Sequence, residues 1–593
     1  MCGIVGWVDY KSAIDEQKIT QMRDTLTHRG PDDAGNYFSH DKKIALAHRR
    51  LSFLDLSMAG HQPMCNETER IWIVLNGEIY NYKELALELS AKGHVFKSSS
   101  DTEVLLHGYE EWGIDKLLQK IKGMFAFALL DENQQQLFLI RDRFGIKPLY
   151  YYASGERFIF GSELKAIIKS GAVEKEINYS SFADYFVYRY IPSPKTIWKN
   201  IAKLQPAHYI KLNIQNGVYE LTEYWKLGSE KKQQSTKQLV QEIGSMIGNS
   251  VSEHSRSDVE IGSFLSGGYD SSAIVYYLSK IKTRVKNFSI GFENWDASEH
   301  QYAAMVSEKL NGVNTSLIAG KESLNILKKL STVYDEPIAD ISIIPTYLVS
   351  QLASFQIKSV MSGEGADELF GGYEWQKQYY KKWRPENFSA KLKNIFLNRS
   401  ENAVNEYSQA MEMGKFDCLI LYQLLNPELH QFIPDDTDWF YRSHYKPQFS
   451  PLKSFQYLDI KCFMAELVLT KVDRASMAHS LEVRVPFLDH ELFQKIFELD
   501  ESVYFKPGIT KFLLHENIKN VLPPQIINRK KQGFVGPDSY YMNMDWYKEI
   551  IYNGKLLSEQ VISKTFVDTL FENKDHWRLW KIAVMENWFN EWN

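Results

Sequence analysis

The chain has 593 residues, of which 44% are hydrophobic and 24% are charged, as in ordinary globular proteins. This length predicts two to four domains. The formal net charge of −5 argues against a nucleic-acid-binding protein, because such proteins carry a strongly basic surface.

The cysteine content and the apolar runs indicate the cellular compartment of the protein. The cysteines are too few for a disulfide framework and form no CxxC pair that would suggest zinc: Cys2, Cys65, Cys418 and Cys462. The longest apolar run, residues 124–130, is far shorter than the ~20 residues that a membrane helix needs. The N-terminal sequence lacks the features of a secretory signal. We therefore expect a cytoplasmic protein with no membrane span.

The first third of the chain mixes short apolar strands with helices. The pattern predicts helices near 16–27, 81–92 and 102–112. Between them it predicts strands at 2–8, 44–47, 71–75, 125–130 and 137–140. This mixture is typical of an α+β layered domain, which we place at residues 2–225. A polar, lysine-rich linker follows at about 228–237.

The chain changes its pattern from residue 238. Helices predicted at 270–282 and 298–311 alternate with strands predicted at 259–265, 285–290, 314–318 and 357–361. Such alternation is typical of a parallel sheet that is covered by helices on both faces. Beyond residue 373 the sequence is mostly helical. We therefore expect a second domain of the α/β class at residues 238–593.

The residue at position 2 is a candidate nucleophile. Removal of the initiator methionine would leave Cys2 with both a thiol and a free α-amine. The amine can then act as the base for its own side chain, as in N-terminal nucleophile hydrolases. Position 2 could equally hold an ordinary small residue, so this hypothesis depends on the rest of the sequence.

A glycine-rich turn lies between the strand predicted at 259–265 and the helix predicted after it. It consists of Ser266, Gly267, Gly268, Tyr269, Asp270 and Ser271. Two glycines let the backbone approach a ligand, and the start of a helix attracts phosphate. The carboxylate of Asp270 suits such a site only if a cation such as Mg²⁺ accompanies the phosphates. The sequence differs from the GxxxxGK[ST] phosphate loop.

A second glycine-rich segment runs from Ser362 to Tyr373 after the strand predicted at 357–361. In an open α/β sheet, turns at the carboxyl ends of strands line the ligand crevice. We expect Asp367 to complete a Mg²⁺ site with Asp270, and Glu364 to face the reacting atoms. A helix cap would explain one of these acidic residues but not all of them.

The N-terminal third also holds the groups that bind a free α-amino acid. An arginine such as Arg50 can bind the carboxylate with two hydrogen bonds, and an acid such as Asp101 can pair with the ammonium. Asn76 and the N–H of Gly77 can support an oxyanion. By themselves these residues only suggest such a site.

Several motifs in this order resemble the glutamine-hydrolysing asparagine synthetase family, over nearly the whole chain. In the N-terminal third they resemble class II glutamine amidotransferases: Cys2–Gly6, His28–Asp32, Arg50–Ser52, Asn76–Asn81, Arg141–Gly145 and Ser162–Lys165. The resemblance implies an αββα sandwich of the N-terminal nucleophile type, followed by a synthetase domain of the Rossmann-like ATP-pyrophosphatase fold with a helical C-terminal part.

The resemblance also implies roles for individual residues. Cys2 corresponds to the nucleophile, with Asn76 and Gly77 as the oxyanion hole. The implied glutamine-binding residues are Arg50, Leu51, Phe53, Leu54, Asn76, Gly77, Glu78 and Asp101. The implied ATP- and pyrophosphate-binding residues are Leu265, Ser266, Gly267, Gly268, Asp270, Ser271, Ile290, Ser362, Gly363, Tyr373 and Asp473. Glu364 corresponds to a catalytic base and Lys531 to a catalytic cation, while Asp270 and Asp367 would hold Mg²⁺.

The implied reaction uses glutamine, ATP and a carboxylate acceptor, and a homodimer is a candidate assembly. Two departures leave the acceptor open. No arginine occurs between Arg284 and Arg384, where aspartate-using members have one, and 100 positions separate Tyr373 from Asp473. We interpret the chain as an asparagine synthetase that acts on aspartate. The alternatives are an enzyme that amidates a cell-wall peptide or polysaccharide carboxylate, and an inactive sensor of glutamine or nucleotide.

Overall fold

The computed structural model describes residues 2–228, 235–383, 399–506, 508–529 and 532–593. Lys531, one of the predicted catalytic residues, lies outside the described residues. Within these ranges, none of the helices combines the length and the apolar character that crossing a membrane requires.

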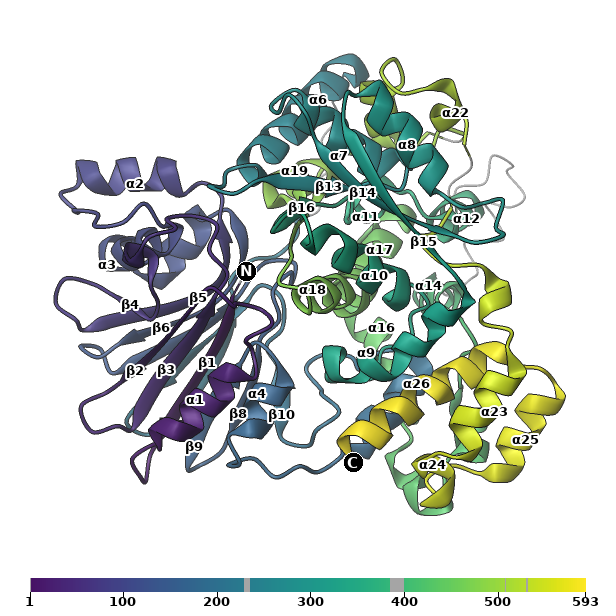
Figure 1. Ribbon diagram of the computed structural model, residues 1–593, viewed down its shortest axis with the longest axis horizontal. Coiled ribbons are helices and arrows are strands. Elements are labelled where there is room, and N and C mark those ends of the chain that lie inside the picture. The colour runs from purple at the N-terminus through teal and green to yellow at the C-terminus, as the bar shows by residue number, and fades with distance from the viewer. Residues whose placement is uncertain (1, 229–234, 384–398, 507, 530–531) are drawn as a thin grey trace.

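Two six-stranded antiparallel sheets form the N-terminal region, at the left of Figure 1. The order of the first sheet is β10 (Ile201–Lys203), β8 (Tyr150–Ala153), β9 (Arg157–Gly161), β1 (Gly3–Asp9), β3 (Ile44–Arg50) and β2 (Asp33–Phe38). The order of the second sheet is β12 (Tyr219–Glu223), β11 (His208–Asn213), β7 (Gln136–Arg141), β6 (Gly123–Asp131), β5 (Ile71–Ile79) and β4 (Met64–Cys65).

Side chains alternate between the two faces of these strands, which explains the layering. In β1, Ile4 and Val8 point into the core between the sheets, whereas Val5 and Trp7 pack on the helical side. The continuous apolar run of β6 divides in the same way between the core and the helices α2 and α3. The outer helices are α1 (Glu16–Asp24), α2 (Tyr82–Ala91), α3 (Asp101–Lys120), α4 (Leu164–Lys169) and α5 (Tyr179–Tyr188). This arrangement is the expected αββα sandwich.

The C-terminal region contains a five-stranded sheet in which every neighbouring pair is parallel, as expected. Its order is β15 (Val313–Ala319), β14 (Lys286–Phe292), β13 (Ile261–Phe264), β16 (Ser359–Met361) and β17 (Glu482–Arg484). The chain after residue 373 is mostly helical, as expected, and the edge strand β17 is a short addition that the sequence did not predict. Its three residues are too short to show a period of two, and only pairing with β16 makes them a strand.

Helices α6 (Thr236–His254), α7 (Tyr269–Ser279) and α8 (His300–Lys309) lie around this sheet (Figure 1). The helices that continue toward the middle of the region are α9 (Leu327–Tyr334), α10 (Ile343–Ser354), α11 (Ala366–Phe370), α12 (Glu374–Trp383), α14 (Arg399–Ala410), α15 (Cys418–Leu424), α16 (Trp439–His444), α17 (Pro451–Leu458) and α18 (Leu469–Met477). The C-terminal helices are α19 (His490–Phe497), α20 (Glu501–Tyr504), α21 (Phe512–Ile518), α22 (Pro524–Ile527), α23 (Met544–Tyr552), α24 (Lys555–Ser558), α25 (Lys564–Glu572) and α26 (His576–Trp592).

One hydrophobic core joins the N-terminal region to the last helix of the chain. Trp198 follows α5 and packs against Trp588 of α26, with ring centroids 5.5 Å apart. The Tyr185 hydroxyl donates a hydrogen bond to the Lys581 carbonyl (2.8 Å), and the Lys581 ammonium donates one to the Phe186 carbonyl (2.8 Å). The two regions therefore share buried structure at some distance from the predicted sites.

Candidate active sites

Cys2 lies at the start of β1, where its side chain is only 7% exposed. Its backbone N–H donates to Oδ1 of Asn76 on β5, at 3.1 Å, so the two strands hold these residues together. The Asn76 Nδ2 group is buried and has no hydrogen-bond partner among the described residues. Burial raises the pKa of the Cys2 thiol, although nearby positive charge and the Leu51 backbone N–H oppose this effect. The pair thus combines a cysteine with an unused hydrogen-bond donor.

Gly77 allows this part of β5 to approach β6 very closely. A Cβ atom at Gly77 would lie 2.1 Å from the Met124 carbonyl oxygen, a distance that no side chain could accept without displacing the backbone. The absence of a side chain at position 77 is therefore a steric requirement of the fold next to Cys2.

Arg50 ends β3 and is 94% buried, with its guanidinium held by backbone carbonyls of the following loop. It donates to the carbonyls of Leu54 (3.0 Å), Asp55 (2.6 Å) and Ser57 (3.1 Å). None of the carboxylates in the described ranges forms an ion pair with it. A buried guanidinium that is fixed in place but lacks a counter-ion is suited to bind an incoming carboxylate.

Asp101 begins α3, and its Oδ2 accepts a hydrogen bond from the Ile79 backbone N–H at 2.8 Å. Burial raises its pKa to about 6, so it is mostly ionised at neutral pH. The neighbouring Glu78 is also buried and its Oε2 lies 3.4 Å from Arg484 of β17. Its pKa is raised well above the usual range, chiefly by burial, with Arg484 opposing. Glu78 therefore interacts electrostatically with both Cys2 and Asp101.

The loop after Arg50 connects this site to the C-terminal region. Leu51 and Phe53 form a small apolar cluster with Met477 of α18, and Leu54 packs into the core below α2 and α3. The backbone N–H of Asp258 donates to the Phe53 carbonyl at 2.8 Å. The predicted wall of the glutamine pocket is thus in contact with the synthetase region.

The turn at residues 266–271 joins β13 to α7, as expected. Ser266 Oγ accepts a hydrogen bond from the Gly268 N–H (3.2 Å) and lies 3.1 Å from Ser271 Oγ. Gly267 has φ +73°, and a Cβ atom there would meet Tyr302 at 2.5 Å, so this position requires glycine. The backbone N–H groups at the start of α7 can donate hydrogen bonds to an anion, so the turn is suited to bind phosphate.

The second glycine-rich segment packs directly against this turn. A Cβ atom on Gly363, next to Ser362 at the end of β16, would lie 2.8 Å from the Cβ of Asp270. Lys511 lies between the two acids, with its ammonium 2.5 Å from Asp270 Oδ2 and 2.7 Å from Asp367 Oδ1. Both carboxylates therefore contact one cationic atom. Burial alone would lower the pKa of Lys511, but Asp270 and Asp367 outweigh it and raise that pKa.

The remaining predicted residues of this half lie in three places. Leu265 and Ile290 are buried at the ends of the adjacent strands β13 and β14. Glu364 lies in the turn before α11, and its Oε2 is buried with no hydrogen-bond partner among the described residues. Tyr373 stacks on Trp375 at 4.1 Å and donates a hydrogen bond to Glu368 Oε1 at 2.8 Å. The unsatisfied oxygen makes Glu364 the acid best suited to accept a proton here.

Asp473 takes part in a different contact. Its carboxylate accepts from Nη1 (2.9 Å) and Nη2 (3.1 Å) of Arg29, and Arg29 Nε donates to the Cys2 carbonyl at 3.0 Å. Among the described residues, no hydrogen bond or ion pair joins Asp473 to either glycine-rich turn. Asp473 therefore lies at the interface between the two regions, and its contact with the nucleotide stays a prediction.

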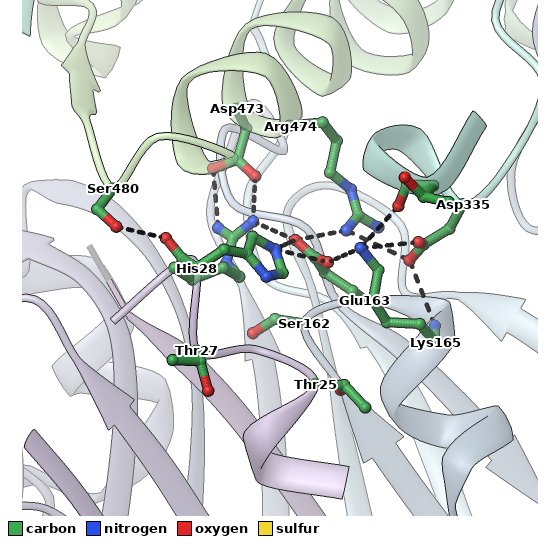
Figure 2. A network of polar contacts seen from close by, with 12 residues as sticks. Thr25, Thr27, His28, Ser162, Glu163, Lys165, Asp335, Asp473, Arg474 and Ser480 are labelled. Atoms are coloured by element: carbon green, nitrogen blue, oxygen red, sulfur yellow. Dashed lines mark hydrogen bonds and ion pairs between the residues drawn. The ribbon is translucent and has the colours of Figure 1, made fainter. Parts of the chain in front are cut away.

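Figure 2 shows the polar network around this contact, with Glu163 at its centre. The carboxylate of Glu163 lies 2.7 Å from Arg474, 2.8 Å from Arg29 and 2.9 Å from Lys165. Asp335 pairs with Lys165 at 3.1 Å on the far side of the network. Burial would raise the pKa of Glu163, but these cations and His28 hold it well below the usual range. The network joins both regions through the buried charges of Arg29, Glu163, Asp473 and Arg474.

Sequence reasoning missed the roles of three of these residues. Arg29 and Glu163 lie in motifs that the family resemblance includes, but no contact could be assigned without the fold. Lys511 begins α21 in the left-handed conformation, with φ +52°. Gly508, three residues earlier, is a turn signal near Lys511, but it does not predict the contact of Lys511 with the two acids.

We expect Glu163→Gln to lower the free energy of unfolding by about 3–5 kcal/mol, because it removes one member of a buried ion-pair network. Denaturant titration measures this effect. The folded pKa lies below the unfolded value of about 4.3. The stabilisation is therefore present above that pH, and it is lost as the pH falls toward the lower folded value.

Glu156→Gln is the matched control, since Glu156 is exposed and pairs only with surface cations. Equal unfolding free energies for the two variants would contradict a structural role of the network.

Comparisons with known proteins identify the families of both regions of the chain. A family profile described as "Glutamine amidotransferase domain" matches residues 1–225, and one described as "Asparagine synthase" matches residues 242–590. The chain is 34% identical to asparagine synthetase (glutamine-hydrolyzing) 1 of Bacillus subtilis, over 99% of this chain and 96% of that protein. It is 31% identical to synthetase 3 of the same organism, over 97% and 94%. It is also 26% identical to amidase chry2 of Gibberella zeae, over 93% and 91%. The chain therefore belongs to the glutamine-hydrolysing asparagine synthetase family of ATP-dependent ligases.

Proposed function

We propose that the protein makes asparagine from aspartate, with glutamine as the nitrogen donor and ATP as the energy source. The observation that carries this proposal is the presence of two candidate sites in one molecule. One pairs Cys2 with the free donor of Asn76, and the other brings Asp270 and Asp367 together at the end of the parallel sheet.

In the first site, Arg50 and Asp101 would bind the carboxylate and ammonium of glutamine. The Cys2 thiolate would attack the side-chain amide, and Asn76 Nδ2 with the Gly77 N–H would stabilise the resulting oxyanion. Ammonia leaves with the proton that the cysteine α-amine has taken from the thiol. Water then hydrolyses the thioester and releases glutamate.

In the second site, the turn at residues 266–271 would hold the phosphates of ATP. Asp270 and Asp367 are the residues that would hold Mg²⁺, and their carboxylates fit a hard divalent cation because both already share one cationic partner. The metal would supply neutralising charge for the leaving pyrophosphate. A carboxylate oxygen of the acceptor attacks the α-phosphorus, and ammonia then displaces AMP from the acyl carbon while Glu364 takes up a proton.

The acceptor has a second candidate, a carboxylate of a cell-wall peptide or surface polysaccharide. Two observations favour it. The first is the missing arginine between residues 284 and 384. The second is that Lys471, a cation that contacts this stretch, donates to Ser342 Oγ at 2.5 Å and lies 3.6 Å from Asp340 Oδ1, so it already has an acidic partner. The relative named as an amidase also indicates that full-length similarity extends beyond proteins named asparagine synthetase.

Pyrophosphate release by the purified chain tests these alternatives directly. The assay compares aspartate with amino-sugar acids, uronic acids and diaminopimelate peptides, in the presence of ATP, Mg²⁺ and ammonium. Release that depends on aspartate supports our proposal, and release that depends only on another acid supports the second candidate. A lack of acceptor-dependent release would favour a sensor of glutamine or nucleotide.

A cytoplasmic location and a homodimer remain predictions, which cell fractionation and light scattering would test.

We expect Cys2→Ala to abolish glutamine-dependent amidation and to leave ammonia-dependent amidation nearly unchanged. The two half-reactions occupy different regions and share only ammonia. Product formation with each nitrogen source, measured side by side, separates them. Loss of the ammonia-dependent activity would show that the two sites are not assigned correctly, and Cys65→Ser is the control.

We expect Arg50→Ala and Asp101→Ala each to raise the KM for glutamine by at least about 30-fold. Loss of one partner of a buried charge pair costs about 2–5 kcal/mol, and about 1.4 kcal/mol corresponds to a factor of ten. Steady-state glutaminase kinetics measure this change. Because the pKa of Asp101 is about 6, the wild-type KM should also rise as the pH falls below that value.

Arg49→Ala serves as the control for these variants, because Arg49 pairs with Asp24 on the outer side of the same strand. If the KM for glutamine stays at the wild-type value in both Arg50→Ala and Asp101→Ala, the glutamine pocket lies elsewhere.

We expect Asp270→Asn and Asp367→Asn to lower acceptor-dependent pyrophosphate release by about 100- to 1000-fold, the usual cost of losing one electrostatic group in an active site. Glutaminase turnover should remain. If the two acids only capped helices, the variants would lose about 0.5–2 kcal/mol of stability and keep their activity. Asp296→Asn, at an exposed position of the same region, is the control.

A further inference from the structure

Two histidines and a glutamate gather on the N-terminal region, beside the helix that starts at Asp101. His94 lies in the segment between α2 and α3, whereas His107 and Glu110 lie three residues apart on α3 and so on one face of it. Each of the three offers one ligand atom, and these atoms all lie within 4.8 Å of one another. No role of the proposed enzyme uses this cluster.

The His107 ring is the buried centre of the cluster. Its side chain is 2% exposed, and Nδ1 lies 3.1 Å from Glu110 Oε2. The other nitrogen, Nε2, lies 3.6 Å from Glu103 and 3.7 Å from Glu67, and it has no hydrogen-bond partner among the described residues. The His94 ring packs against it, with ring centroids 4.9 Å apart. The two nitrogens of this buried ring therefore face different carboxylates, and Nδ1 is the nitrogen beside Glu110.

The cluster also carries an excess of negative charge. Glu103 and Glu67 lie 3.6 Å and 3.7 Å from His107, and a further acid, Glu111, lies 3.6 Å from His94. Carboxylates gathered beside imidazoles attract a divalent cation.

Neighbouring groups already fix the two acids of α3 that face His107. Glu103 accepts hydrogen bonds from the backbone N–H groups of Lys97 (2.8 Å) and Ser98 (2.7 Å). Glu110 Oε1 accepts one from Asn66 Nδ2 at 2.7 Å, which leaves its other oxygen facing His107. Oriented carboxylates beside a histidine are the usual support of a metal ligand.

We propose that His94, His107 and Glu110 bind a divalent transition-metal ion, with zinc as the metal that best fits two imidazoles and one carboxylate. Tetrahedral zinc with bonds of about 2.0–2.1 Å holds its ligand atoms roughly 3.4 Å apart. Side-chain movements of about 1 Å would therefore bring the three ligand atoms to this spacing. A water molecule would take the fourth position.

The site would tie the segment before α3 to the helix itself. His107 follows Asp101 by six residues, about 9 Å along a helix. A bound metal would thus hold the first turns of α3, where Asp101 lies, against the segment that carries His94. This role is structural and does not depend on which acceptor the enzyme uses.

Zinc and cobalt titrations of the untagged, chelator-treated full-length chain test the proposal. We expect one zinc ion per chain by calorimetry, a higher melting temperature with zinc, and the visible absorption of tetrahedral cobalt. His94→Ala and Glu110→Gln should each weaken zinc binding by at least about 100-fold, beyond the usual 10–100-fold effect of supporting residues.

His40→Ala, at an exposed histidine of the same region, is the control and should bind zinc as the wild type does. The proposal is overturned if the wild type binds no zinc, or if both ligand variants bind it with unchanged affinity. A strong thiolate absorption band with cobalt would also overturn it, because the ligand would then be a cysteine. Glutamine kinetics of the variants would show separately whether the proposed function is affected.

Discussion

Neutralisation of one buried guanidinium connects the two halves of the molecule. Arg29 is fully buried, so its charge needs carboxylate partners, and each region supplies one: Glu163 from the N-terminal sheets and Asp473 from α18. The remaining donor of the same group, Nε, binds the carbonyl of Cys2. The backbone of the proposed nucleophile is therefore positioned by a charge that is satisfied only when the C-terminal region is in place.

This arrangement ties the two regions together. Separating them would remove the Arg29 partner of Asp473 and would expose the aromatic packing of Trp198 against Trp588. Breaking a buried ion pair costs several kcal/mol. A fixed relation between the sites suits an enzyme in which ammonia released at one site is consumed at the other, because motion between the regions would let ammonia escape to water.

Local sequence signals predicted much of this structure. Short apolar or alternating runs predicted strands β1, β3, β5, β6 and β7, and the glycines beside Asp270 and Asp367 predicted two turns that the structure brings together. Contacts between distant segments had no such signal. The pairing of Asp473 with Arg29, the three-residue strand β17 and the position of Lys511 depend on tertiary packing, which no spacing in the sequence encodes.

Lys511 gives the proposed nucleotide site an internal counter-ion. Its ammonium lies between Asp270 and Asp367, where the proposed reaction would hold Mg²⁺. A metal ion would have to compete with this tethered ammonium, so a free cation alone would gain little by entering. A metal that arrives together with phosphates would bring anions that can pair with the displaced ammonium. The lysine would thus favour the metal–nucleotide complex over the bare ion.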